Sequence, residues 1–173
     1  MQRLTRTACA VIAAAVLGAV APPPATAAPT PAKHVRTYDK HLLKYVNNAR
    51  ANNGLKPLKQ SNRLYKIAHR WAAHLAKSHD NLEHNPKFVL GGPLVTRTCP
   101  HATAAGENVG AQAQTAPKSL FKLYMDEPYH RANILSPKYN SRGTPRYTYV
   151  GIATVKASDG SEWNVMDFAN HCR

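Results

Sequence analysis

Apolar residues recur at helical spacing in two early segments of the chain. In the first segment these positions are Tyr38, Leu42, Tyr45, Val46 and Ala49. Steps of three and four residues place such side chains on one face of a helix. The pattern predicts an amphipathic helix over residues 38–52, with Thr37 as its N-cap and Gly54 as its C-terminal stop.

The second segment carries a clearer apolar stripe. Its positions are Leu64, Ile67, Ala68, Trp71 and Leu75. Ser61 precedes the stripe and predicts an N-cap, and the helix should continue to about residue 78. His69, His74 and His79 follow one another at five-residue steps, about 140° apart around the helix axis. They are therefore expected at the surface, and not around one metal ion.

Helical periodicity is lost over residues 79–109, where prolines and glycines recur. We expect a long irregular segment there, and such segments are often functional or anchored. Pro117 then predicts the start of a third helix that ends near Asp126.

The late part of the chain is rich in β-branched and aromatic residues. Residues 147–155 and 162–168 flank the turn sequence Ser-Asp-Gly-Ser at 158–161. This arrangement predicts a β-hairpin. Helices followed by strands indicate an α+β domain in which helices cover an antiparallel sheet.

The first residues have the order of a secretory signal peptide. Arg3 and Arg6 precede an apolar run that ends in small residues and prolines, with Ala25-Thr26-Ala27 as the cleavage sequence. A short membrane anchor is the alternative, but about 20 apolar residues are needed to span a bilayer. We therefore predict a signal peptide at 1–27, a flexible lead-in at 28–36, a domain at 37–173 and a secreted, extracellular protein.

Removal of the signal peptide takes Cys9 with it and leaves Cys99 and Cys172. In an exported protein two cysteines most simply form a disulfide. Such a bridge would stabilise the fold by about 4 kcal/mol in the chain-entropy model. A free thiol or an intermolecular bridge is the alternative.

The chain is strongly basic, with 23 Lys and Arg against 9 Asp and Glu and a formal charge of +14. Such a surface attracts acidic envelope polymers or anionic lipids, or it serves solubility alone. The cations are scattered and are not grouped with aromatic residues, so we expect no specific nucleic-acid recognition. The expected state is a monomer.

Several catalytic signatures are absent from the sequence, among them His-Glu-x-x-His, Gly-x-Ser-x-Gly and the phosphate-binding glycine loop. A cysteine nucleophile is not expected if both remaining cysteines are bridged. The candidate chemistry therefore lies with His84, Glu107, Glu127 and His130.

Glu127 and His130 have the spacing of a helical pair, but Pro128 lies between them. A residue before proline avoids the helical conformation, and proline suits the first position of a new helix. We therefore expect Glu127 at a helix junction, as N-cap or last residue, and His130 in the first turn of a short helix over 128–135.

Five motifs follow one another along the chain. They are Leu82-x-His84, Gly106-Glu107-Asn108-Val109, Tyr124-x-x-Glu127, the run His-Arg-Ala-Asn-Ile-Leu at 130–135, and Val150-Gly151-Ile152. Together they resemble the CAP superfamily of cysteine-rich secretory, antigen 5 and pathogenesis-related class 1 proteins. The similarity spans residues 38–168 and is greatest to the bacterial, secreted SCP-like branch.

The resemblance implies a three-layer α-β-α sandwich with a cleft lined by His84, Glu107, Glu127 and His130. It also implies that His84 and His130 can hold zinc or another divalent cation. Glu127 matches the complete set of four, whereas Tyr124 replaces the usual Trp and Tyr129 is expected to narrow the cleft. Residues 141–146 add a loop that forms either a basic lip or a plain surface turn.

Each of the four residues also has a structural alternative. His84 would cap the second helix region, Glu107 would bind backbone amides, Glu127 would serve only as an N-cap, and His130 would be a hydrogen-bonded junction residue. Arg131 and Asn133 are assigned to structure, as residues that hold the junction backbone.

Three functions fit this sequence. The preferred one is a non-enzymatic binding module for a divalent metal, or for a small hydrophobic or envelope-derived ligand. The alternative is a metal-dependent hydrolase of peptidase or esterase type, with Glu107 or Glu127 as general base. A third is adsorption to acidic polymers by charge alone. Two protein ligands fall short of the usual three at catalytic zinc, which favours the binding module.

Overall fold

The computed structural model describes residues 33–78, 81–113, 115–136 and 147–173, with side chains from Thr37 onward. The elements in chain order are α1 (Lys33–Asn52), β1 (Lys59–Gln60), α2 (Asn62–Ser78), α3 (Pro93–Thr98), β2 (Ala105–Gln112), α4 (Pro117–Asp126), α5 (Pro128–Ile134), β3 (Tyr149–Lys156) and β4 (Glu162–Ala169).

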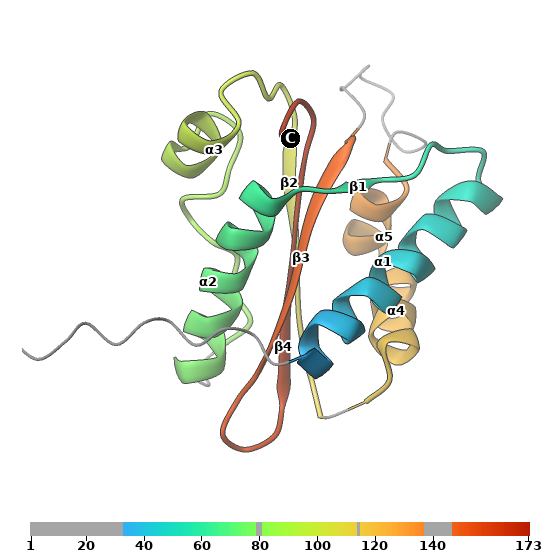
Figure 1. Cartoon of the computed structure of the whole chain (residues 1–173), viewed down its shortest axis with the longest axis vertical. Coiled ribbons are helices and arrows are strands. Elements are labelled where there is room, and N and C mark those ends of the chain that lie inside the picture. Colours follow the sequence, from blue (N-terminus) through green and yellow to red (C-terminus); the bar gives the residue numbers. More distant parts are fainter. Residues whose placement is uncertain (1–32, 79–80, 114, 137–146) are drawn as a thin grey trace, which may run out of the picture. The chain divides into compact units, whose positions relative to one another are not determined.

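A four-stranded sheet forms the middle layer of the domain, with the strand order β1-β3-β4-β2 (Figure 1). The predicted hairpin is confirmed, since β3 and β4 pair antiparallel, and β2 pairs antiparallel with β4. The sheet was expected to be antiparallel; it is mixed, because the short strand β1 runs parallel to β3. A strand of two residues carries no periodicity that a sequence could reveal.

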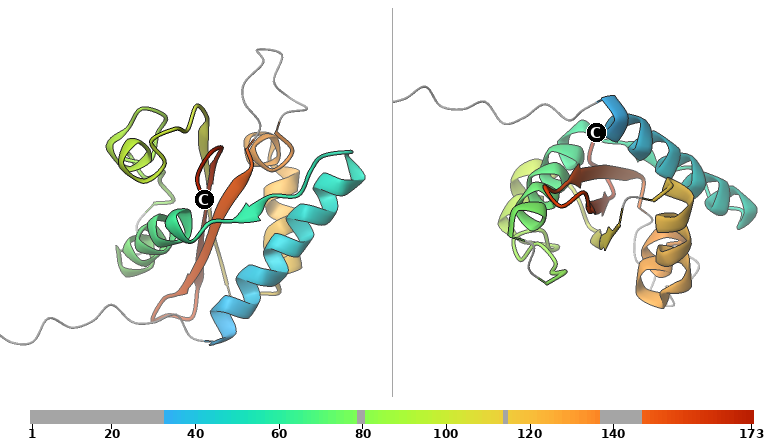
Figure 2. Two further views of the ribbon diagram at one scale, coloured as in Figure 1. Left: turned by 45° about the horizontal axis from the view of Figure 1, so that its top comes forward. Right: turned by 90° about the horizontal axis from the view of Figure 1, so that it is seen from below.

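Helices cover both faces of this sheet, so the α+β, three-layer fold class is confirmed. Helices α2 and α3 lie on one side, and α1, α4 and α5 lie on the other (Figures 1 and 2). The apolar stripes supply the core: Leu42 and Val46 pack under α1 with β3 and β4, and Ala68 and Leu75 pack under α2. None of the described helices is both long and apolar enough to cross a bilayer.

The two long helices follow the predicted pattern with one difference at the start of α1. That helix begins at Lys33, so Thr37 lies within it, and residues 33–36 are helical where a flexible lead-in was expected. Gly54 ends the helix with a φ of +69°, and the Ser61 hydroxyl accepts from the Leu64 amide at 3.4 Å, as an N-cap should.

The signal peptide, residues 28–32, His79 and the 141–146 loop lie outside the described residues.

The segment expected to be irregular contains α3 and most of β2, so that prediction is wrong in part. Gly106, one of the glycines in this segment, has another role. A Cβ there would lie 3.0 Å from Oδ1 of Asn133, so glycine allows α5 to approach the strand closely. Glycine occurs both where elements pack closely and in turns, so its presence alone does not distinguish a strand from a loop.

The predicted disulfide between Cys99 and Cys172 is confirmed, with a Cα–Cα distance of 4.9 Å. Both cysteines are buried beside Leu64 and Ile67 of α2. The bridge therefore ties the end of α3 to the C-terminus under the first turns of α2.

Helix α2 approaches β3 most closely at Gly151, where a Cβ would overlap the backbone of Leu64 and Tyr65. We predict that Gly151→Ala lowers the free energy of unfolding by about 3 kcal/mol, because backbone atoms cannot yield as side chains do. Urea unfolding followed by circular dichroism measures this change.

The matched control is Gly54→Ala, where nothing lies within 4 Å of the added Cβ and only the positive φ opposes alanine. That variant should lose only about 1 kcal/mol. An equal loss in both variants would contradict a steric origin at Gly151.

Candidate functional site

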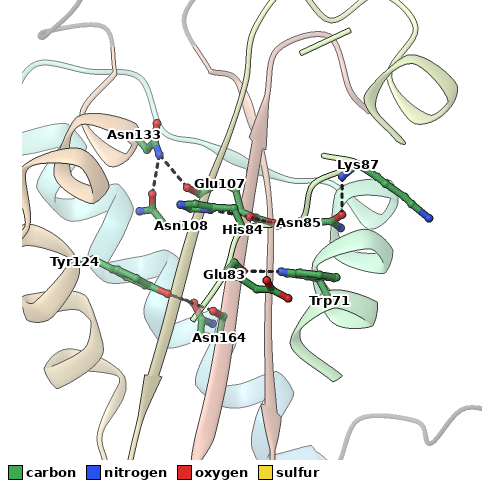
Figure 3. A network of polar contacts seen from close by, with 10 residues as sticks. All are labelled: Trp71, Glu83, His84, Asn85, Lys87, Glu107, Asn108, Tyr124, Asn133 and Asn164. Atoms are coloured by element: carbon green, nitrogen blue, oxygen red, sulfur yellow. Dashed lines mark hydrogen bonds and ion pairs between the residues drawn. The ribbon is translucent and has the colours of Figure 1, made fainter. Parts of the chain in front are cut away.

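The first half of the predicted cleft is formed by His84 and Glu107. Nδ1 of His84 lies 2.8 Å from Oε1 of Glu107, and the Asn85 amide donates to the same oxygen at 2.8 Å (Figure 3). The Glu107 side chain is 4% exposed, whereas the His84 ring is 65% exposed. A buried carboxylate of β2 therefore holds the loop after α2 and orients an imidazole toward solvent.

The second half lies at the junction of α4 and α5, as the proline predicted. Glu127 is the N-cap of α5, and its Oε2 accepts from the His130 amide at 2.7 Å. That amide lowers the pKa of the Glu127 carboxyl. Nδ1 of His130 lies 3.4 Å from the same oxygen, so this imidazole also faces a carboxylate.

Asparagines of β2 and α5 connect the two halves. The Asn108 amide donates to the His130 carbonyl at 3.1 Å, and Asn133 donates to the Glu107 carbonyl at 3.1 Å and to Oδ1 of Asn108 at 2.8 Å (Figure 3). Arg131 donates to the Met125 carbonyl at 2.8 Å, across the junction. Arg131 thus holds the junction backbone as predicted, whereas Asn133 also has a structural role but bonds to β2 and not to the junction.

The four predicted residues form two pairs, and their convergence on one ion remains a prediction. Burial lowers the pKa of His130; the charge of Glu127 opposes this effect and the charge of His84 adds to it. In the described part of the chain, no three or more His, Cys, Asp or Glu side chains group as a metal site would.

A cleft of about 330 Å³ adjoins the first pair. His84 and Glu107 supply its polar side, and Phe88, Val89 and Leu90 supply an apolar side. Val89 and Leu90 are about half exposed, so the apolar side continues to the surface. Tyr129 is 83% exposed and does not line this cavity, and its expected effect on the cleft between the two pairs stays a prediction.

The sequence analysis missed Asp167, which lies behind Glu107. The two residues face each other across the β2–β4 pairing, and Asp167 is fully buried. When both carboxyls are ionised, neither oxygen of Asp167 has a hydrogen-bond partner among the described residues, and Oε2 of Glu107 has none either. An acidic residue inside the apolar strand sequence Val-Met-Asp-Phe-Ala was the signal available.

The proximity of these two carboxyls changes their protonation. Burial raises the pKa of Asp167 well above its usual range, and the charge of Glu107 raises it further. Burial also raises the pKa of Glu107, against hydrogen bonds from Asn85 and His84. Two adjacent buried carboxyls retain one proton, which supplies the hydrogen bond that two carboxylates cannot form.

Comparison with known proteins agrees with this architecture. The sequence matches CAP, the Cysteine-rich secretory protein family, over residues 43–168, and the chain belongs to this family. It is 30% identical to the Bacillus subtilis (strain 168) protein YkwD over 135 residues, which cover 75% of this chain and 46% of that protein. The chain thus spans less than half of this relative's length.

Solved structures show the same fold at low sequence identity. An outer surface protein from Borrelia burgdorferi superposes with a TM-score of 0.62 at 15% identity, over 79% of this chain and 95% of that one. A cysteine-rich secretory protein from Staphylococcus aureus gives 0.61 at 21% identity, over 80% and 40%. An extracellular SCP-domain protein from Bacillus anthracis gives 0.60 at 16% identity, over 83% and 45%. These relatives are described as secreted, extracellular or surface proteins.

We predict that Asp167→Asn changes how stability depends on pH. The folded-state pKa of Asp167 is raised, so wild-type stability falls as pH rises from about 4, the ordinary carboxyl pKa, toward the folded value. Asparagine does not titrate, so the variant should gain about 1 kcal/mol or more over the wild type between pH 4 and pH 8. Urea unfolding at pH 4, 6 and 8 measures the difference.

Asp126→Asn is the control, because Asp126 is an exposed carboxylate with a lysine partner. Its stability should follow the wild-type pH profile. Parallel profiles for the wild type and Asp167→Asn would contradict a raised pKa at Asp167.

Proposed function

We propose that this CAP-family protein is a secreted, non-enzymatic binding module that takes a divalent cation on His84 and His130 and a small amphipathic ligand in the adjoining cleft. One observation carries the proposal. Each imidazole directs Nδ1 toward a carboxylate, which leaves Nε2 as the ring nitrogen available to a ligand.

The chemistry of this donor set fits zinc. A carboxylate that binds one imidazole nitrogen fixes the tautomer and makes the other nitrogen a better metal ligand. Two protein ligands are fewer than the three that catalytic zinc sites use. Since the described residues add no third ligand to either pair, a bound ion would keep much of its water, as in weak or transient binding.

The cleft beside His84 supports a ligand with a polar head and an apolar body. Its volume of about 330 Å³ lies at the lower end for small-molecule sites. His84 offers a hydrogen bond at one side, and Val89 and Leu90 offer partly exposed apolar surface at the other. Small hydrophobic or envelope-derived molecules outside the cell have this chemistry.

A metal-dependent hydrolase is the second candidate. The raised pKa of buried Glu107, within hydrogen-bond distance of His84, is a property that general acids and bases share. Against this candidate, the two histidines are fewer than the three protein ligands that catalytic zinc sites use.

We predict that calorimetry detects weak zinc binding by the wild type. His84→Ala and His130→Ala should each lower the zinc affinity at least tenfold, which is a loss of about 1.4 kcal/mol in binding free energy. His74→Ala, on the surface of α2, is the control and should bind as the wild type does. Binding should weaken as the pH falls, because protonated His130 cannot bind metal; burial lowers the pKa of His130, so the loss should lie below about 6.5, the ordinary value for histidine. If His84→Ala and His130→Ala both bind zinc with wild-type affinity, the assignment of these histidines as zinc ligands is refuted.

The hydrolase is tested on the same proteins with a panel of peptide and ester substrates. The binding-module proposal expects no turnover that depends on the site. Hydrolysis that a chelator stops and that His130→Ala abolishes would overturn it in favour of the enzyme.

For the apolar side of the cleft, we predict that laurate displaces the fluorescent probe 1-anilinonaphthalene-8-sulfonate from the wild type. The double variant Val89→Ser and Leu90→Ser should bind laurate at least tenfold more weakly, because it removes the exposed apolar wall. Leu123→Ser, at an equally exposed leucine of α4, is the control. Equal losses in both variants would show surface adsorption in place of cleft binding.

A further inference from the structure

The outward face of helix α2 carries a row of cationic side chains. The helix packs on β3 and β4 through its apolar face, which leaves the opposite face to solvent (Figure 1). Helical spacing places five exposed residues on that opposite face, and they are Arg63, Lys66, Arg70, His74 and Lys77. We call these five residues the α2 row. The helical rise makes the row about 21 Å long.

The positive charge of the α2 row is not balanced on the helix itself. Residues 62–78 include no Asp or Glu. None of the five side chains forms an ion pair with a carboxylate in the part of the chain that the structure describes, whereas Lys122 of α4 pairs with Asp126 one turn away. Like charges three and four residues apart destabilise a helix, so an anion bound along the row would stabilise α2.

Burial of acidic residues makes the surface more positive than the composition suggests. Asp39, Glu107, Glu162 and Asp167 are all buried. Burial raises the pKa of Asp39 to about 7, and it also raises the pKa of Glu107 and of Asp167. These carboxyls lie inside the fold and are partly protonated near neutral pH. The α2 row therefore attracts anions with little competition from them.

A groove of about 280 Å³ adjoins the middle of the α2 row. Arg70 and His74 of the row line it together with Trp71, and Lys87 contributes a further cation from the segment after α2 (Figure 3). The rings of Trp71 and His74 stack with their centres 4.7 Å apart. The Trp71 indole donates to the Glu83 carbonyl at 3.0 Å, which fixes its position. The groove thus combines two aromatic rings with cations from two segments.

The row and the groove together indicate the chemistry of a partner. Cations about 5 Å apart along a helix match a polymer with one negative charge in each repeat unit, whereas a small anion would contact only one or two of them. A sugar ring presents C–H groups that pack on aromatic side chains. A membrane surface is less suited, because none of the exposed large apolar side chains in the described segments lies on α2.

We propose that the α2 row binds a linear acidic polysaccharide, whose carboxylates contact the cations of the row and one of whose rings occupies the groove beside Trp71. The groove shares Asn85 with the cleft beside His84, but none of the residues that would bind the sugar. The surface is independent of the proposed cation and ligand site at His84 and His130. Failure of this proposal would leave that one unchanged.

The test compares three probes that separate charge from sugar. They are hexagalacturonate, its fully methyl-esterified form, and hexaglutamate, which carries carboxylates at a regular spacing without sugar rings. Calorimetry at low salt should show that the wild type binds hexagalacturonate at least about tenfold more tightly than either of the others. Added salt should weaken this binding, because exposed ion pairs are screened.

Variants locate the bound polymer on the surface. The double variant Lys66→Gln and Arg70→Gln should bind hexagalacturonate about tenfold more weakly, the loss expected for two exposed ion pairs. Lys118→Gln with Lys122→Gln is the matched control, since it removes two exposed charges at the same spacing on α4, across the sheet (Figure 1). The control should keep wild-type affinity.

NMR spectra test the groove without a substitution. Hexagalacturonate should shift the backbone amides of Trp71, His74 and Lys87, and it should leave those of Lys118 and Lys122 in place.

Four outcomes would overturn the proposal. Equal affinity for hexagalacturonate and hexaglutamate, or equal losses in the α2 and α4 double variants, would show adsorption by charge alone. Tighter binding to phosphatidylglycerol vesicles than to hexagalacturonate would assign the row to a lipid surface. No binding of hexagalacturonate at all would leave the row as a solvated face.

Discussion

Successive residues of a β-strand point to opposite faces of its sheet, and in β2 this alternation separates the two halves of the site. Glu107 points to the face that α2 covers, where it holds His84 and the Asn85 amide. Asn108 points to the other face, where it holds the His130 carbonyl and Asn133. Since one strand supports both histidine-carboxylate pairs, the pairing register of β2 against β4 decides the whole arrangement. A slip by one residue would exchange the two faces and dismantle both pairs.

The same register brings two carboxyl groups together inside the protein. Asp167 stands opposite Glu107, in a strand whose residues are all buried. Such a position weakens the fold at neutral pH, because neither carboxyl is solvated and only a shared proton relieves their repulsion. The consequence for the site is that Glu107 is an acceptor for His84 on one side and the neighbour of a protonated acid on the other. The basicity of Glu107 therefore depends on Asp167, which lies behind it in the sheet and outside the cleft.

Polar groups also cross the face of the sheet beneath α1. Tyr124 stands beside His130, with the rings edge to face and their centres 5.0 Å apart, and its hydroxyl begins the row through Asn164 and Thr154 that ends at Asp39. His130 and strand β3 are thus connected by one ring contact and a row of buried hydrogen bonds.

Features that depend on neighbours along the chain could be predicted without coordinates. Periodicity predicted α1 and α2, Pro128 predicted the junction that makes Glu127 an N-cap, and the Asp-Gly turn predicted the hairpin. The motifs indicated the four candidate site residues, and the two remaining cysteines predicted the disulfide. Each of these features rests on local spacing, on backbone restrictions of one residue, or on a family pattern.

Features that depend on distant segments became visible only in the folded chain. Most of strand β2 lies in the segment expected to be irregular, because Gly106 serves the approach of α5, a contact that no local pattern encodes. The pairing of Asp167 with Glu107, and the unsatisfied oxygen of Asp39 under α1, arise where separate elements meet. The protonation of a buried carboxyl is set by the groups that folding places around it, and in this protein those groups are far away in the sequence.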